Sequence, residues 1–195
     1  METRRIPLQP ECYYQIYNRG INGQDIFLEE RNYPYFFEKY SRFVHPFFET
    51  YAYCLLKNHF HLLVRARSEE DLRHLMNGKH KEKSCSYILS NAFGTFFKSY
   101  SLSINKCYDR TGGLFEEPFR RIPIESDSYF TRLIHYIHFN PQKHGFVDDF
   151  RKYPYSSYQS HMHSKETKLN RNYVLNWFDG LDQYIRFHEQ MQEDT

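Results

Sequence analysis

The stretch TYAYCLLKNHFHLLVRAR, residues 50–67, decides the fold. Residues 50–56 and 61–67 have the aromatic and aliphatic composition that is typical of β-strands. Lys57 and Asn58 lie between them and leave room only for a tight connection. The stretch therefore predicts two neighbouring antiparallel strands.

Further elements are predicted on both sides of this pair of strands. Residues 12–18 indicate a strand that ends before a Gly-containing loop. Apolar residues at helical spacing predict helices over residues 31–48 and 84–106. Residues 114–124 predict a strand or extended hairpin, although Pro118 argues against a regular central strand there.

The remaining residues predict one more helix of the core and a separate extension. Ser126 and Asp127 are a good N-cap signal for a helix that we expect to end at Asn140, just before Pro141. Beyond it we expect an ordered surface loop at 153–158, a polar linker at 161–172 and a C-terminal helical piece at 173–192.

The order of these elements is strand, helix, strand, strand, helix, strand, helix. The first six of these elements predict an α+β fold of ferredoxin-like type: one antiparallel sheet with helices packed on one face. A short C-terminal helical extension is expected in addition. We accordingly divide the chain into a domain of residues 1–150 and a loop and helical extension of residues 151–195.

Composition limits the kinds of protein that this chain can be. Aromatic residues make up 19% of the chain, with 18 Tyr and 18 Phe, which excludes a disordered protein. The tyrosines also offer flat surfaces on which unpaired bases can stack. The net charge of +2 allows nucleic-acid binding without requiring it.

Cysteine spacing and hydropathy argue against two further classes. Cys12, Cys54, Cys85 and Cys107 lie far apart with no C-x-x-C pair, so neither a zinc ribbon nor a dense disulfide framework is predicted. No apolar run approaches the ~18 residues of a membrane span, and the first ten residues contain no apolar leader segment. We therefore expect a cytoplasmic protein with no membrane partner.

Two histidines in the decisive stretch form an H-x-H triplet. On a strand, His59 and His61 point to one face and Phe60 to the other. Two imidazoles on one face can chelate a divalent ion; they suit transition metals better than Mg²⁺. The alternative is a pair of surface histidines at the start of a strand.

A second group of candidate residues lies on the predicted helix that follows residue 126. Tyr136 and Asn140 are four residues apart and share a helix face, so a phenol and an amide project to the same side. Asn140 offers a carbonyl oxygen as a third ligand, and Tyr136 offers a nucleophile for covalent catalysis. His138 lies roughly 200° away on the opposite face and is left out of this group, as is His135. The alternative is that Tyr136 belongs to an apolar stripe.

These two motifs together resemble a known family. NHFHLLV at residues 58–64, followed by YIHFNP at residues 136–141, is similar to the single-tyrosine HUH transposases, and within that superfamily to the REP-associated tyrosine transposases. YNRG at 17–20, GLFEEPFRR at 113–121 and PYSSY at 154–158 fit the same resemblance. These stretches cover most of residues 12–158.

The resemblance implies a fold, a cofactor, a substrate and a reaction. It implies a catalytic domain over residues 1–150 with Mg²⁺ or Mn²⁺ bound by His59, His61 and Asn140. It implies a substrate of single-stranded DNA next to a hairpin, of the REP type. Tyr136 is expected to attack a phosphodiester, forming a 5′-phosphotyrosine that a second 3′-hydroxyl then resolves. Nucleoid association when DNA is bound, and a monomeric or homodimeric state, follow as expectations.

Basic residues at five positions are candidates for contacts with DNA, because such side chains position the phosphate backbone. These are Arg19, Lys98, Lys106, Arg120 and Arg121. For each of them the alternative is a solvated surface charge.

Three other functions fit parts of the sequence. The first is a catalytically silent regulator that binds hairpin DNA or RNA without cutting it. The second is a metal-dependent nuclease in which water attacks, so no protein–DNA adduct forms. The third is a structural protein with two incidental histidines and no metal dependence.

Overall fold

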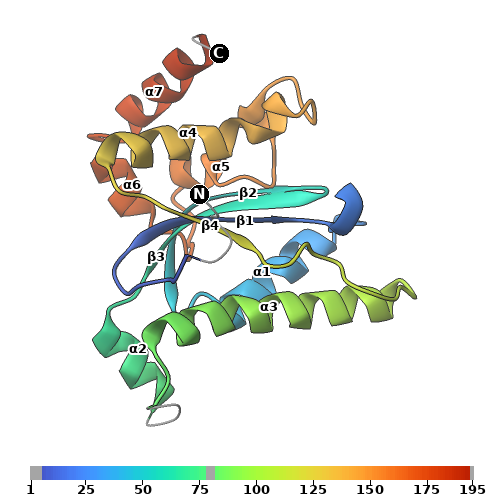
Figure 1. Ribbon diagram of the computed structural model, residues 1–195. Coiled ribbons are helices and arrows are strands. Elements are labelled where there is room, and N and C mark those ends of the chain that lie inside the picture. The colour runs from blue at the N-terminus through green and yellow to red at the C-terminus, as the bar shows by residue number, and fades with distance from the viewer. Residues whose placement is uncertain (1–5, 78–81, 194–195) are drawn as a thin grey trace.

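A computed structural model describes residues 6–77 and 82–193 of the chain, and Figure 1 shows the arrangement of its helices and strands. The first five residues and residues 78–81 and 194–195 lie outside the described part. No helix in the described ranges is long and apolar enough to cross a membrane.

The centre of the fold is a four-stranded sheet. Its strands are β1 (Tyr13–Arg19), β2 (Phe48–Leu56), β3 (His59–Ala66) and β4 (Arg120–Pro123). They lie in the order β2-β3-β1-β4, and all neighbours are antiparallel. With a helix between β1 and β2 and another between β3 and β4, this is the ferredoxin-like arrangement that the sequence predicts.

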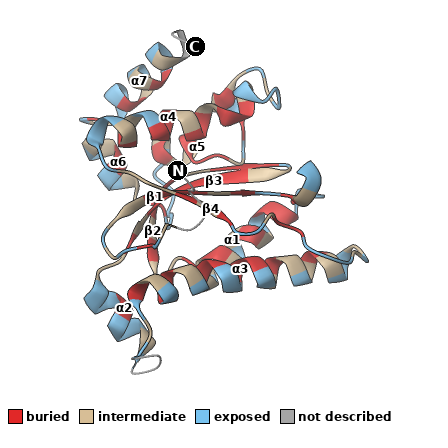
Figure 2. Cartoon of the chain, viewed as in Figure 1, coloured by how far each residue is buried: buried red, intermediate tan, exposed pale blue. Residues whose placement is uncertain are grey.

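Two helices cover one face of this sheet. They are α1 (Asn32–Phe43) and the long α3 (Cys85–Cys107), with the short α2 (Glu69–Met76) leading into α3. Phe36, Phe60 and Phe96 are fully buried between the helices and the sheet. Alternation along β3 makes this possible, because Phe60, Leu62 and Val64 all point to the same side. Figure 2 shows the buried layer between the sheet and α3.

The prediction of helices on one face is confirmed for the two helices of the first six elements, α1 and α3, and the opposite face of the sheet is covered by the elements that follow β4. Here lie α4 (Asp127–Lys143), α5 (Tyr158–Met162), α6 (Arg171–Trp177) and α7 (Leu181–Glu193). The reason is a second apolar cluster, in which Leu56 and Leu63 of the sheet are fully buried with Ile137 of α4. Exposing this face to water would cost about 25 cal/mol per Å² of apolar surface.

Helix α4 extends past the end that the sequence predicts. It passes through Pro141 and ends at Lys143 instead of stopping at Asn140. Pro141 removes a single backbone donor there, while His144 N–H still donates to the Asn140 carbonyl at 3.0 Å. The extra residues place Lys143 in the last turn of α4 and His144 at its C-cap.

The segment predicted as a surface loop is buried against the sheet. Leu55 N–H donates to the Tyr155 carbonyl, and Ser157 N–H donates to the Tyr53 carbonyl, both at 2.9 Å. Ser157 has no exposed surface. These bonds satisfy the backbone groups of β2, which would otherwise be an open edge strand.

Two other predictions differ in detail. Only Arg120–Pro123 of residues 114–124 forms a strand, although Phe115 makes an isolated bridge to Gly20. The predicted C-terminal helix is two helices, separated at Gly180, whose φ of +110° suits glycine. The extension packs on α4 through Trp177, whose Nε1 donates to Thr131 Oγ1 at 3.0 Å, and through the buried Tyr184, whose hydroxyl lies 3.3 Å from His138 Nδ1. The division at residue 150 stays a prediction.

Candidate active site

The two histidines of the H-x-H triplet lie side by side on β3, facing α4. Their ring centroids are 5.4 Å apart, and the planes are nearly perpendicular. His61 is 6% exposed, whereas His59 is half-buried at the end of the strand. The structure therefore brings together the pair that the sequence places on one face, with His61 buried and His59 partly exposed.

Helix α4 places its two candidate residues against this pair. The Tyr136 ring lies 5.6 Å from the His61 ring, centroid to centroid. Asn140 is completely buried, and its Nδ2 donates to the Tyr136 carbonyl at 2.7 Å. Its Oδ1 is buried and makes no hydrogen bond of good geometry in the described part of the chain, although the Asn140 side chain lies close enough to His59 to raise the pKa of that histidine slightly. A buried oxygen without a donor is costly, so it favours a ligand that supplies positive charge.

Burial keeps both histidines neutral. It lowers the pKa of His59 to about 4, with smaller effects in the same direction from His144 and Arg19, and the Asn140 side chain acts in the opposite direction. Burial also lowers the pKa of His61 to about 3, helped by the charges of His59 and His144. Neutral imidazoles keep a lone pair that can bind a metal ion at neutral pH.

These residues fit a divalent cation. Two neutral imidazoles and an unpaired amide oxygen form a mixed donor set that suits Mn²⁺ and, less commonly, Mg²⁺. Within the described ranges no group of three His, Cys, Asp or Glu side chains could hold a metal ion. A cation here would therefore depend on Asn140 as well as on the histidines.

The far side of α4 is fixed by a buried chain of hydrogen bonds. His188 Nδ1 lies 2.8 Å from the Tyr184 carbonyl and must donate to it, so His188 Nε2 is an acceptor. His138 Nδ1, 2.9 Å away, donates to that nitrogen, and the Ser157 hydroxyl donates to His138 Nε2 at 2.7 Å. Ser157 Oγ also accepts from the Tyr53 N–H of β2 at 2.9 Å. His138, set aside at the sequence level, thus ties α4 to the sheet.

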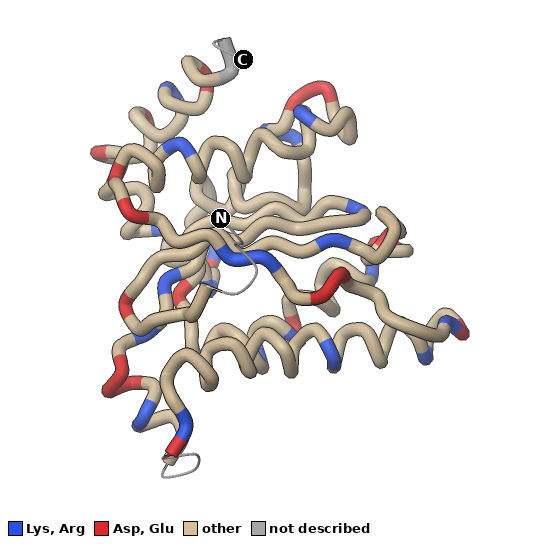
Figure 3. Tube along the Cα trace, viewed as in Figure 1, with Lys and Arg blue, Asp and Glu red and all other residues tan. Residues whose placement is uncertain are grey.

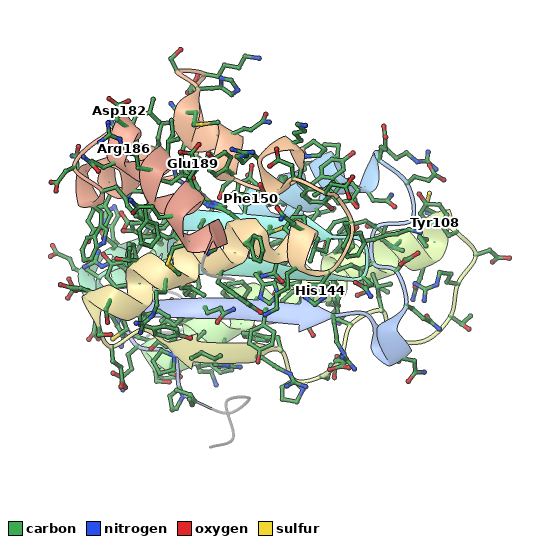
Figure 4. The ribbon with its side chains drawn as sticks, turned by 90° about the horizontal axis from the view of Figure 1, so that it is seen from above. Tyr108, His144, Phe150, Asp182, Arg186 and Glu189 are labelled. Carbon is green, nitrogen blue, oxygen red and sulfur yellow. The ribbon has the colours of Figure 1, made fainter. Side chains whose placement is uncertain are left out.

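Three residues near the site were not identified from the sequence. Tyr17 of β1 stacks on His61, with centroids 5.4 Å apart. Lys143 Nζ lies 5.1 Å from the centre of the Tyr136 ring, and the exposed His144 ring lies 5.0 Å from that of His59. Figure 4 shows His144 at the carboxyl end of α4. Helical spacing from Asn140 would have found His144 had the helix been continued through Pro141.

Two of the candidate DNA-binding arginines lie next to this site. Arg19 is the cross-strand partner of His59, and Arg120 lies over the Tyr17 ring at 5.8 Å. Glu116 joins them, with its carboxylate oxygens 2.6 Å from Arg19 Nε and 3.6 Å from Arg120 Nη2. The two guanidinium groups are thereby held at one edge of the histidine site.

The other three candidates lie elsewhere. Lys98 and Lys106 are exposed on α3, beyond the opposite face of the sheet, and Lys98 lines a cavity of about 660 Å³ beside the loop before β4. Arg121 is 8% exposed; its Nη1 donates to Ser90 at 2.9 Å and its guanidinium lies 4.2 Å from the Phe119 ring centre. In Figure 3 basic positions mark β4, the end of β1 and α3, with acidic positions in the loop between α3 and β4.

Comparison with known proteins supports the resemblance read from the motifs. No family model matches the chain. A curated protein of Haemophilus influenzae is 29% identical over 111 residues, which are 57% of this chain and 59% of the relative. That protein carries a provisional description as a REP-associated tyrosine transposase. The match spans less than two thirds of that relative's length.

A solved structure shares the fold. It is described as a REP-associated tyrosine transposase bound to a REP hairpin, and it aligns with a TM-score of 0.60 at 14% identity, covering 83% of this chain and 86% of that one. A bacterial tRNA(His) guanylyltransferase-like protein in complex with GTP aligns with a TM-score of only 0.37 at 12% identity, covering 77% and 74% of the two chains. The chain therefore resembles the REP-associated tyrosine transposases in sequence and in fold.

Proposed function

We propose that this chain is a REP-associated tyrosine transposase, which cleaves and rejoins single-stranded DNA next to a hairpin. The observation that carries the proposal is the meeting of Tyr136 and Asn140 on α4 with His59 and His61 on β3 in one site, where His61 and Asn140 are buried and Tyr136 and His59 are partly exposed. The curated relative and the shared fold support the same assignment.

Tyr136 is the nucleophile in this proposal. The Tyr136 phenol loses its proton, and its oxygen forms a bond to phosphorus as the bond from phosphorus to the 3′ oxygen breaks. The 3′ oxygen takes up a proton, which leaves a 5′-phosphotyrosine and a free 3′-hydroxyl. A second 3′-hydroxyl attacks the phosphotyrosine, restores a phosphodiester and returns the phenol. One covalent link is exchanged for another of the same kind, so no external energy source is needed.

The residues around Tyr136 have distinct roles. His59, His61 and Asn140 would hold Mg²⁺ or Mn²⁺, which when bound offsets negative charge on the scissile phosphate. The Lys143 ammonium lies 5.1 Å from the Tyr136 ring centre and offsets the negative charge that develops on the phenol oxygen as it loses its proton. Tyr17 stacks on His61 and lies under the Arg120 guanidinium, so it holds both residues in position beside Tyr136.

The proposed DNA contacts follow from the placement of the basic residues. Arg19 and Arg120 lie at the edge of the site and are assigned to phosphates of the strand being cut. Lys98 and Lys106, exposed on α3, are assigned to more distant parts of the DNA. Arg121 is held by Ser90 and Phe119, and we assign it a structural role.

We propose that Tyr136 acts in the site of its own chain, because its ring lies 5.6 Å from that of His61 of the same chain. The expected monomeric or homodimeric state and the cytoplasmic, nucleoid-associated location stay predictions.

A strand-transfer assay tests the proposed function. A single-stranded oligonucleotide, labelled at its 3′ end and carrying a hairpin from the DNA next to the gene, is incubated with Mn²⁺ or Mg²⁺ and with an unlabelled acceptor strand that ends in a 3′-hydroxyl and is longer than the substrate. We expect a labelled product longer than the substrate, and its loss with EDTA. Shortened products alone would instead identify a nuclease, and binding without any cleavage would identify a silent hairpin-binding regulator.

A further inference from the structure

Each histidine of the site has a second ring nitrogen that contacts an amide side chain. His59 Nδ1 lies 2.7 Å from Asn58 Oδ1. Because that oxygen can only accept, His59 Nδ1 carries the proton and Nε2 keeps a lone pair. His59 is therefore already in the form that a metal ligand requires.

His61 has the opposite arrangement. Gln15 Nε2 lies 3.1 Å from His61 Nδ1 and donates to it, so the ring proton lies on Nε2. In this form His61 Nε2 has no lone pair for a cation. The two histidines of one site are thus held in different tautomers by their amide partners.

Gln15 is placed so that it can reverse this arrangement. It is 5% exposed in β1, where its cross-strand partners are Leu63 of β3 and Ile122 of β4. The two ends of a glutamine amide are nearly equal in size, so a half-turn exchanges Oε1 for Nε2 with little change in packing. After that turn Oε1 faces His61 Nδ1, which then carries the proton.

We propose that Gln15 is a positioning residue that sets the tautomer of His61, turning its amide when a divalent cation binds. The inference rests on the proposed function, because it concerns the cation that the reaction uses. Histidine ligands of metal ions almost always donate their other N–H to an acceptor, which fixes the ring and increases its basicity. Gln15 supplies that acceptor from a strand that carries none of the proposed ligands.

The test is the affinity of the full-length protein for Mn²⁺, measured by isothermal titration calorimetry. Gln15→Met keeps the length of the side chain and removes the acceptor, and we expect it to weaken binding about 10–100-fold. Gln15→Glu keeps an acceptor and has no donor, so we expect it to bind Mn²⁺ at least as tightly as the native chain.

A control variant separates this effect from loss of a buried polar group. Thr50 is 6% exposed in β2, and its hydroxyl is 2.7 Å from that of Tyr40, away from the histidines. We expect Thr50→Val to leave the Mn²⁺ affinity unchanged, even if it lowers stability. ¹⁵N NMR of the histidine rings, with and without Mg²⁺, reports the tautomer directly; we expect the His61 proton on Nε2 without the ion and on Nδ1 with it.

Several results would overturn the inference. They are an unchanged affinity in Gln15→Met, an equal loss in Thr50→Val, or a His61 proton that remains on Nε2 with Mg²⁺ bound. If strand transfer persists in Gln15→Met at unchanged metal affinity, the positioning role fails and the proposed function stands. If the native chain neither binds Mn²⁺ nor transfers strands, both fail.

Discussion

Replacing His161 by phenylalanine should make the protein markedly less sensitive to acid. His161 is 1% exposed, and its ring nitrogens make no hydrogen bond of good geometry in the described residues beyond a weak contact with the Tyr51 backbone. Burial lowers its pKa from 6.5 to about 3, the Tyr51 carbonyl acting slightly in the other direction and Arg171 adding to the decrease. Between pH 6.5 and about 3, His161 therefore stays neutral in the folded chain and is protonated in the unfolded chain.

The sign and size of the effect follow from proton linkage. Above pH 6.5 His161 is neutral in the folded and in the unfolded chain, and its contribution to the free energy of unfolding is fully present. That contribution is lost as the pH falls from 6.5 towards 3, because in this range only the unfolded chain binds the proton. At pH 5, which lies 1.5 units below the unfolded-state pKa of 6.5, protonation of the unfolded chain at this one histidine lowers the free energy of unfolding by about 2 kcal/mol. With a urea m-value of about 2 kcal/mol/M, the unfolding midpoint shifts by about 1 M.

The assay is urea unfolding of the native chain and of His161→Phe at pH 8 and pH 5. Between pH 8 and pH 5, the free energy of unfolding of the native chain should fall by about 2 kcal/mol more than that of His161→Phe. Exposed His163, two residues away, provides the matched control, and His163→Phe should keep the native pH dependence. An equal loss of stability in the native chain and in His161→Phe would refute the reasoning.

Three further predictions concern α4 and the bound DNA. Asn140→Leu should abolish Mn²⁺-dependent strand transfer and weaken Mn²⁺ binding in calorimetry while hairpin binding persists; full activity would contradict a ligand role for the buried Oδ1. Arg120→Ala should reduce the slope of log affinity against log salt for the hairpin oligonucleotide by about 1, whereas Arg121→Leu should lower the melting temperature and leave that slope unchanged. Ser157→Ala should cost about 1–3 kcal/mol in urea unfolding, because it leaves His138 Nε2 and the Tyr53 N–H without partners; a cost no larger than that of Ser160→Ala would contradict this account.

The sequence was informative where a local pattern determines the structure. Alternation along β3 correctly placed His59 and His61 on one face, and helical spacing correctly placed Tyr136 and Asn140 on one side of α4. Both patterns depend only on the repeat of a strand or a helix.

What the sequence did not reveal depends on contacts between distant segments. The burial of Ser157 depends on the edge of β2, about a hundred residues earlier, and no local pattern reports such pairing. The role of His138 depends on His188, fifty residues later. Gln15 becomes notable only because β1 pairs with β3 in a register that puts its amide beside His61.

A local rule also caused one error. Proline was expected to end α4, yet Pro141 is tolerated in its last turn. As a result Lys143 and His144 were missed, although both lie on the helix that carries Tyr136.

The central claim is that Tyr136 forms a covalent bond to DNA, and intact-protein mass spectrometry tests it most directly. The full chain, Tyr136→Phe and the control Tyr129→Phe, from the same helix, are incubated with the hairpin oligonucleotide and Mn²⁺ and then denatured. We predict that the native chain and Tyr129→Phe gain the mass of the 5′-phosphorylated cleavage product, mapped to Tyr136 by peptide analysis, and that Tyr136→Phe gains none. An adduct of the same mass in Tyr136→Phe, or cleavage by the native chain without any adduct, would contradict the claim.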